Sequence, residues 1–186
     1  MKRFDAVKRT IERAPDSLVV CCNGMIGREG WTAGDRPGHF YMIGSMGLAS
    51  SVALGLALAQ PAKRVLCVDG DGNVLMGLGA LASVGAAAPK NLYHVCLDNE
   101  AHGSTGDQAT ITSKVELDKI AAACGYVRVA RATDEASLER GLEVLLGGPG
   151  PAFLLVKVER GNVKGIGRVE LTPRQLTDRA RAEATR

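Results

Sequence analysis

Two short apolar segments that run into aspartate and asparagine constrain this sequence most strongly. Residues 65–68 and 92–97 are runs of about five apolar, β-favouring residues, and the first continues into the polar turn at residues 69–73. Such runs are typical of strands buried on both faces of a parallel sheet. The intervening residues 74–88, rich in Ala, Leu and Gly, predict one crossover helix. We therefore expect a strand–helix–strand unit whose polar ends meet at the carboxyl edge of a sheet, where open α/β folds bind ligands.

The rest of the chain continues this alternation of strands and helices. Apolar segments predict further strands at residues 17–22, 40–43, 126–130 and 152–158. Helical patterns lie at residues 4–13, 48–59, 115–123 and 133–146, and a capping box at Thr172 and Gln175, with Pro173 between them, opens a last helix. The alternation predicts an α/β fold with a doubly wound, mostly parallel sheet of about six strands and helices on both faces. We expect one domain over residues 1–186, with a helical tail at about 172–186 that frays from Asp178.

Two segments are expected to lack regular structure. Residues 27–39, rich in Gly, Arg and Asp, predict an irregular excursion. Arg36 and His39 within it are interpreted as solvated loop residues, the alternative being contacts to an anionic substrate. Residues 100–112 are longer than most connections in α/β units, which indicates a functional loop.

Composition excludes several classes of protein. Hydrophobic residues make up 46% of the chain and charged residues 23%, as in ordinary globular domains. The net charge of +3 is scattered and aromatic content is 4%, so we expect no nucleic-acid partner. No apolar run reaches the roughly 20 residues of a membrane span. The five cysteines form no Cys-x-x-Cys pair and the amino terminus lacks the apolar core of a signal peptide, which favours a cytoplasmic protein without zinc or iron–sulfur sites.

The residues around Asp71 favour a magnesium-bridged phosphate. Gly70 and Gly72 flank Asp71 and allow a ligand to approach the backbone, and Asn73 is expected to cap the following helix. A helix amino terminus attracts phosphate, but a neighbouring carboxylate repels it unless a cation lies between them. Oxygen ligands suit Mg²⁺, and Asn99, at the end of the next strand, can supply a second one.

Gly70-Asp71-Gly72, followed by Asn99 28 positions after Asp71, resembles the signature of thiamine diphosphate-dependent enzymes. Asp98 stands where the family has the first of two asparagines, a departure from its pattern. The resemblance implies that Mg²⁺ is bound by the side chains of Asp71 and Asn99 and by the backbone carbonyl of Ala101. The diphosphate of the cofactor would complete its coordination.

Further stretches carry the same resemblance. Gly44-Ser45-Met46-Gly47, before a helix of small residues, is similar to the segment that holds the cofactor's aminopyrimidine. There the Gly44 carbonyl would bind the pyrimidine amine and Met46 would wedge between the two rings; core packing is the alternative for Met46. The residues that the resemblance assigns to cofactor binding are Cys22, Asn23, Gly44, Ser45, Met46, Gly70, Asp71, Gly72, Asn73, Asn99, Ala101 and Gly103.

Residues 97–110 are the most specific stretch. They resemble the phosphonopyruvate and sulfopyruvate decarboxylases, which are carboxy-lyases with a similar Asp-Asn, Ser-Thr-Gly and Gln-x-Thr order. The resemblance extends from about Ser17 to the carboxyl end. It implies a small anionic 2-oxo acid as substrate. His102 is a candidate proton donor, and an exposed loop histidine is the alternative.

These enzymes also need a pyrimidine-binding domain, whose glutamate activates the cofactor, and no residue of this sequence matches that glutamate. The chain therefore resembles the diphosphate-binding β subunit of a two-chain enzyme. We expect a pyrimidine-binding α subunit as partner, and self-association when the chain stands alone. The alternatives are another thiamine-dependent lyase or ligase, such as an acetolactate synthase-like protein, and a non-catalytic α/β module that binds a nucleotide or phosphate.

Overall fold

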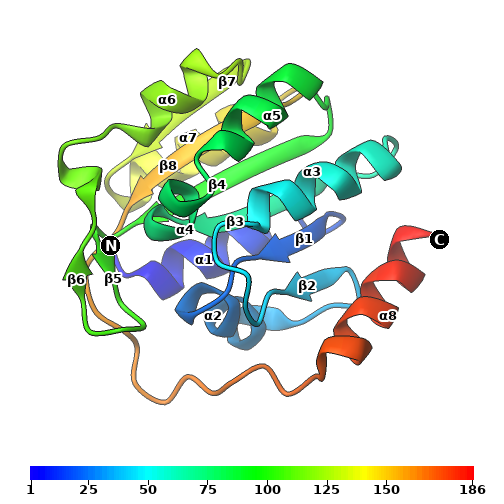
Figure 1. Ribbon diagram of the computed structural model, residues 1–186, viewed down its shortest axis with the longest axis horizontal. Coiled ribbons are helices and arrows are strands. Elements are labelled where there is room, and N and C mark those ends of the chain that lie inside the picture. The colour runs from blue at the N-terminus through cyan, green and yellow to red at the C-terminus, as the bar shows by residue number, and fades with distance from the viewer.

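A six-stranded parallel sheet organises the chain, as the computed structural model of residues 1–186 shows (Figure 1). In spatial order its strands are β2 (His39–Tyr41), β1 (Leu18–Cys21), β3 (Val65–Gly70), β4 (Leu92–Asp98), β8 (Ala152–Lys157) and β7 (Arg128–Ala132). Every neighbouring pair is parallel. The predicted doubly wound α/β sheet of about six strands is confirmed.

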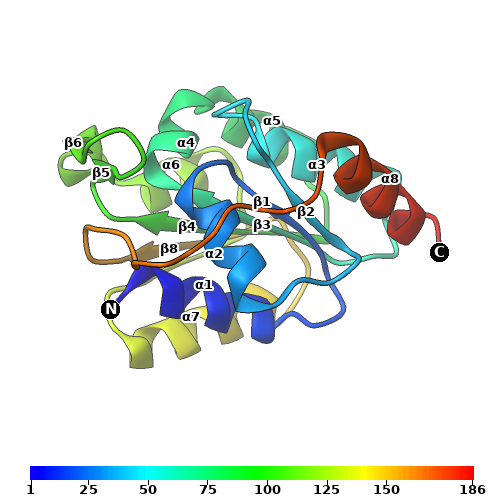
Figure 2. The ribbon, with the colours of Figure 1, turned by 90° about the horizontal axis from the view of Figure 1, so that it is seen from below.

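Helices cover both faces of the sheet (Figure 2). One face carries α1 (Arg3–Glu12), α2 (Met25–Gly34) and α7 (Glu135–Leu146); the other carries α3 (Ala49–Ala59), α4 (Asp71–Met76), α5 (Gly79–Ala87) and α6 (Leu117–Ala123). A small antiparallel hairpin of β5 (Ala101–His102) and β6 (Gln108–Ala109), then the 3₁₀ turn η1 (Ile111–Ser113), follow β4. The last helix, α8 (Pro173–Ala184), lies beside β2 at the sheet edge (Figure 1). No helix is both long enough and apolar enough to cross a membrane.

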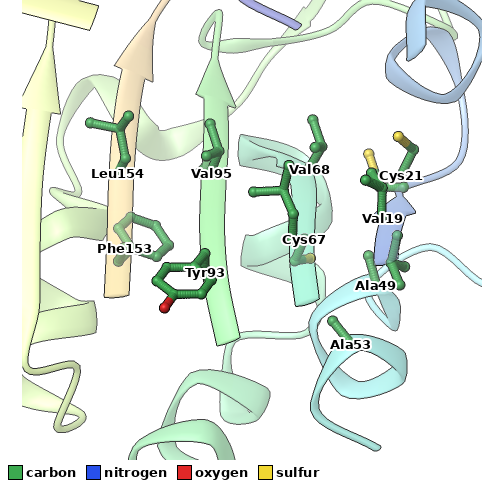
Figure 3. Packing of buried hydrophobic residues seen from close by; sticks show 14 of the residues in the cluster. Val19, Cys21, Ala49, Ala53, Cys67, Val68, Tyr93, Val95, Phe153 and Leu154 are labelled. Atoms are coloured by element: carbon green, nitrogen blue, oxygen red, sulfur yellow. The ribbon is translucent and has the colours of Figure 1, made fainter. Parts of the chain in front are cut away.

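The central strands are buried along their whole length, which explains their continuous apolar sequence. All residues of β3 and β4 are buried. Val68, Val95 and Leu154 pair in register and form one row of side chains across three strands (Figure 3). On the opposite face, the small side chains of α3 let that helix approach the sheet closely; those buried are Ala49, Ser50, Ala53 and Ala57.

The prediction of an irregular segment at residues 27–39 is wrong over most of its length, because α2 occupies Met25–Gly34. Its glycines mark close packing rather than disorder. A Cβ on Gly27 would lie 2.8 Å from the carbonyl oxygen of Cys22, and one on Gly30 would lie 2.9 Å from Sγ of Cys21. Tertiary packing of α2 against β1 has therefore overridden low helix propensity.

The single helix predicted at residues 74–88 is in fact two, α4 and α5. The break is at Gly77, where a Cβ would lie 1.9 Å from the carbonyl oxygen of Gly47. The prediction that Asn73 caps the helix is also wrong. The helix begins earlier, at Asp71 after Gly70, and Asn73 is its third residue.

The carboxyl-terminal helix does not fray at Asp178 but continues to Ala184. Its predicted capping box at Thr172 and Gln175 is confirmed. Farther along, Arg179 forms an ion pair with Asp35 at 2.6 Å and donates to the backbone carbonyl of His39 at 2.8 Å. These tertiary contacts hold the charged part of α8 against the sheet edge.

His39 is not a solvated loop residue. It is the first residue of β2, is fully buried, and bonds Arg36 and Tyr41. Its position at the amino-terminal edge of the sheet also removes it from the carboxyl edge, where ligands are expected. Both interpretations of His39 from the sequence are therefore corrected.

Candidate active site

A pocket lies at the carboxyl edge of the sheet, where β1, β3 and β4 end. It is lined by all the residues assigned from the sequence except Gly44 and Ser45. The pocket lining also includes Arg3, Gly24, Met25, Ile26, Leu97 and Ser104. Strand ends far apart in the chain are thus brought to one concave surface, as the parallel topology requires.

Asp71 is held with its carboxylate anchored on one side. The side chain is buried, and its Oδ2 accepts hydrogen bonds from the hydroxyls of Thr110 at 2.6 Å and Thr112 at 3.3 Å. Burial raises the pKa of Asp71; the Thr110 hydrogen bond opposes that shift, and the nearby charge of Asp98 adds to it. Burial makes the charged form of a carboxylate unfavourable, so a nearby cation stabilises that form strongly.

Three asparagines of the pocket each leave one buried amide atom without a protein partner. They are Asn73 and Asn99, through Nδ2, and Asn23, through Oδ1. Buried polar atoms are rarely left unpaired, since each costs about 1–3 kcal/mol. Unpaired amide donors beside a buried carboxylate fit an anionic ligand together with a cation, so the residues present suit a magnesium diphosphate.

The backbone adds donors on the α2 side of the pocket. Gly24 has a positive φ of 85° and precedes the first turn of α2, and Met25 and Ile26 of that turn line the pocket. The first N–H groups of a helix have no partner within the helix and carry partial positive charge. This end of α2 therefore suits phosphate oxygens.

Gly72 is the point where Met46 and His102 meet. A Cβ on Gly72 would lie 2.6 Å from Cε1 of His102 and 3.3 Å from Cε of Met46. Met46 is 37% exposed and lines the pocket, so the core-packing alternative for it is wrong. His102 belongs to β5, is half-buried and lines the pocket too, so it is not a freely exposed loop histidine.

Asp98 lies outside the pocket and takes a supporting position. It accepts from Thr112 at 2.8 Å and pairs with Lys157 at 2.8 Å. Lys157 also pairs with Glu100; partial burial lowers the pKa of Lys157, but these two hydrogen bonds outweigh it and raise the pKa above its usual value. Lys157 thus ties β8 to the segment after β4.

Comparisons with known proteins point to one family. Residues 20–156 match the family described as "Thiamine pyrophosphate enzyme, C-terminal TPP binding domain". A solved structure from Mycobacterium smegmatis, described as "a putative thiamin diphosphate-dependent enzyme", shares the fold with a TM-score of 0.67 at 23% identity, over 86% of this chain and 32% of that one.

Among curated relatives, the phosphonopyruvate decarboxylase of Streptomyces viridochromogenes is 45% identical over 98% of this chain, which spans 46% of that protein. The chain therefore spans about half the length of such relatives. The sulfopyruvate decarboxylase β subunits of Methanothermobacter thermautotrophicus and Methanococcus maripaludis are 41% and 35% identical, and the chain covers 84% and 95% of their lengths. This chain thus belongs to the thiamine pyrophosphate enzymes and carries their C-terminal, TPP-binding domain.

Proposed function

We propose that this chain is the diphosphate- and Mg²⁺-binding part of a thiamine diphosphate-dependent 2-oxo acid decarboxylase, a carboxy-lyase. Its substrate is a three-carbon 2-oxo acid that carries a sulfonate or phosphonate. The observation that carries the proposal is the pocket in which a buried Asp71 carboxylate adjoins buried, unpaired amide atoms of asparagines. Bound thiamine diphosphate supplies an electron sink for the loss of carbon dioxide.

Different residues of the pocket bind different parts of the cofactor and its metal ion. Asp71, Asn99 and the carbonyl of Ala101 hold the Mg²⁺, and Asn23, Asn73, Gly103 and the first turn of α2 bind the diphosphate. Met46 supports the cofactor rings, together with the backbone of Gly44 and Ser45. His102, whose imidazole lies against Gly72, exchanges a proton near the reacting carbon.

A second subunit completes this site. The pocket lining contains no glutamate, so the group that activates the pyrimidine must come from elsewhere. Exposed apolar side chains lie next to the pocket on α3, on α4 and in the segment between β2 and α3. They are Ile43, Leu48, Val52 and Met76, exposed by 62%, 50%, 39% and 68%. Such a patch suits a protein partner, which is a pyrimidine-binding α subunit in the enzyme and a second copy of this chain when it is alone.

The relatives support this assignment over its alternatives. The names of the M. thermautotrophicus and M. maripaludis relatives include "subunit beta". An acetolactate synthase from Escherichia coli is only 29% identical over 63% of this chain, which makes that activity the weaker candidate. Membership of the TPP-binding family removes the nucleotide-binding alternative. The five free cysteines support a cytoplasmic location.

Substrate choice can be tested in the complex reconstituted with its pyrimidine-binding subunit. We expect Mg²⁺- and thiamine diphosphate-dependent release of carbon dioxide from sulfopyruvate or phosphonopyruvate, with kcat/KM at least tenfold above that for pyruvate. Pyruvate as the preferred substrate, or condensation of two pyruvates, would point instead to an acetolactate synthase-like enzyme.

A further inference from the structure

Arg3 is a buried cation at the pocket that the proposed function leaves without a role. It is the first residue of α1 and only 6% exposed. Its Nε and Nη2 donate to the two carboxylate oxygens of Glu29, at 2.8 and 2.9 Å, and Nη2 also donates to Oδ1 of Asn162 at 2.8 Å. Glu29 is fully buried in α2. The guanidinium is therefore fixed in plane by α2 and by the loop that follows β8.

That loop and the β5–β6 hairpin are joined around Arg3. Asn162 donates from Nδ2 to the carbonyl of Gly103 at 2.9 Å. The backbone N–H of Glu159 donates to the carbonyl of Met1 at 3.0 Å, which keeps the loop beside the start of α1 (Figure 2). Three segments distant in sequence thus converge on one arginine side chain.

The remaining nitrogen, Nη1, has no hydrogen-bond acceptor in the protein. Nη1 lies close to Gly103: a Cβ on that glycine would be 3.7 Å from Nη1. Arg3 and Gly103 both line the pocket, and Arg3 is the only lysine or arginine that does. A guanidinium whose other donors are paired thus presents one free N–H edge to a pocket suited to an anion.

The position of Arg3 favours the phosphate end of the pocket. Glu29, which orients it, belongs to α2, and the first turn of that helix also lines the pocket. The helix that orients the Arg3 guanidinium is therefore also the helix whose amino terminus lines the pocket. Met46 and His102, by contrast, meet at Gly72 of α4.

We propose that Arg3 binds the terminal phosphate of thiamine diphosphate through Nη1, with Glu29 and Asn162 as its positioning residues. This inference rests on the proposed function and adds to it a cofactor contact from the amino-terminal helix. Arginine suits the role because its planar fork can bond a carboxylate along one edge and an oxyanion along another.

The test uses the reconstituted complex with Mg²⁺ and compares thiamine diphosphate with thiamine monophosphate, which lacks the terminal phosphate. The double variant R3Q/E29Q removes both charges, so that no buried carboxylate is left unpaired. We expect its Kd for thiamine diphosphate to rise roughly tenfold or more, as for a lost charge-assisted hydrogen bond, while the Kd for the monophosphate changes by less than about threefold.

The matched control is R9Q/E139Q, which removes an Arg–Glu pair that joins α1 to α7 outside the pocket. Its affinities for both ligands should equal those of the unmodified complex. R3K serves as the second variant if R3Q/E29Q does not fold, since lysine keeps the charge beside Glu29 but loses the Nη1 edge. It should also lower affinity for the diphosphate selectively.

An unchanged Kd for thiamine diphosphate in R3Q/E29Q, or in R3K where R3Q/E29Q does not fold, would overturn the inference and leave the proposed function intact. An equal loss of affinity for thiamine diphosphate and thiamine monophosphate would overturn it as well. A raised KM for the 2-oxo acid at saturating cofactor, without a change in cofactor Kd, would assign Arg3 to the substrate instead. Failure of the unmodified complex to bind thiamine diphosphate would overturn the proposed function, and this inference with it.

Discussion

The side-chain oxygen of Asn73 accepts a hydrogen bond from the backbone N–H of Gly47. This contact joins the helix that begins at Asp71 to the segment that carries Met46. The backbone of Gly47 also lies against Gly77, where α4 ends. The two segments that the proposed site assigns to the metal and to the cofactor rings are therefore held together by contacts within the chain.

The approach of Gly47 to Gly77 gives a prediction about stability. In Gly77→Ala, the new Cβ would lie 1.9 Å from the Gly47 carbonyl oxygen, so backbone must move. We expect the free energy of unfolding in urea to fall by about 3 kcal/mol or more. Gly79→Ala is the control because nothing lies within 4 Å of its Cβ, and it should leave stability unchanged or raise it by up to about 1 kcal/mol. Equal effects of the two substitutions would contradict the close approach.

Replacing Asp71 should separate ligand binding from folding. Burial raises the pKa of Asp71 and so disfavours its charged form in the ligand-free protein. Asp71→Asn should therefore leave the melting temperature of the ligand-free complex unchanged or higher. The stabilisation by Mg²⁺ with thiamine diphosphate, about 3 kcal/mol at a hundredfold excess over Kd, should disappear. Thermal melting with and without the two ligands measures both effects, and a D71N complex still stabilised by them would remove Asp71 from the metal site.

His102→Gln tests the proton-transfer role. Glutamine has a similar length and polarity but does not titrate, so we expect kcat of the reconstituted enzyme to fall by about 100-fold. The Kd of thiamine diphosphate should change by less than about threefold. A variant with near-normal kcat would show that His102 only fills space against Gly72.

His39 predicts a pH dependence of stability far from the pocket. Burial, together with the charges of Arg36 and Arg179 and against that of Asp35, lowers the pKa of His39 from 6.5 to about 4. The unfolded chain therefore binds the proton more readily. The contribution of His39 is complete above pH 6.5 and is lost as the pH falls toward 4, a change of about 3 kcal/mol. The difference in unfolding free energy between the wild type and His39→Gln should vary by that amount over this range; a constant difference would be contrary evidence.

The sequence predicts the sheet well because its signal is local. β3 and β4 are short apolar runs, and their polar ends fall where the chain leaves the sheet. The α2 helix was missed because Gly27 and Gly30 lower local helix propensity, while their benefit, close packing on β1, depends on residues elsewhere. The break at Gly77 was missed for the same reason, since the carbonyl of Gly47 that requires it lies on a different segment.

Some residues of the candidate site likewise have a local sequence signal, whereas others depend on the tertiary fold. Asp71, Asn99 and Met46 follow strands and could be assigned from motif spacing. Thr110 is the threonine of the Gln-x-Thr motif, but its hydrogen bond to Asp71 depends on how the hairpin after β4 folds back. Arg3 gives no sequence signal, because an arginine at the start of an amphipathic helix is usually solvated, and only the tertiary fold pairs it with Glu29.

Division of the active site between this chain and a partner can be measured by titration. The pyrimidine-binding subunit is added to a fixed amount of this chain, with Mg²⁺, thiamine diphosphate and the 2-oxo acid present, and carbon dioxide release is followed. We predict no release above background from this chain alone and a rise that saturates at a fixed ratio of the two subunits. Turnover by this chain alone at the rate of the complex would contradict a divided site.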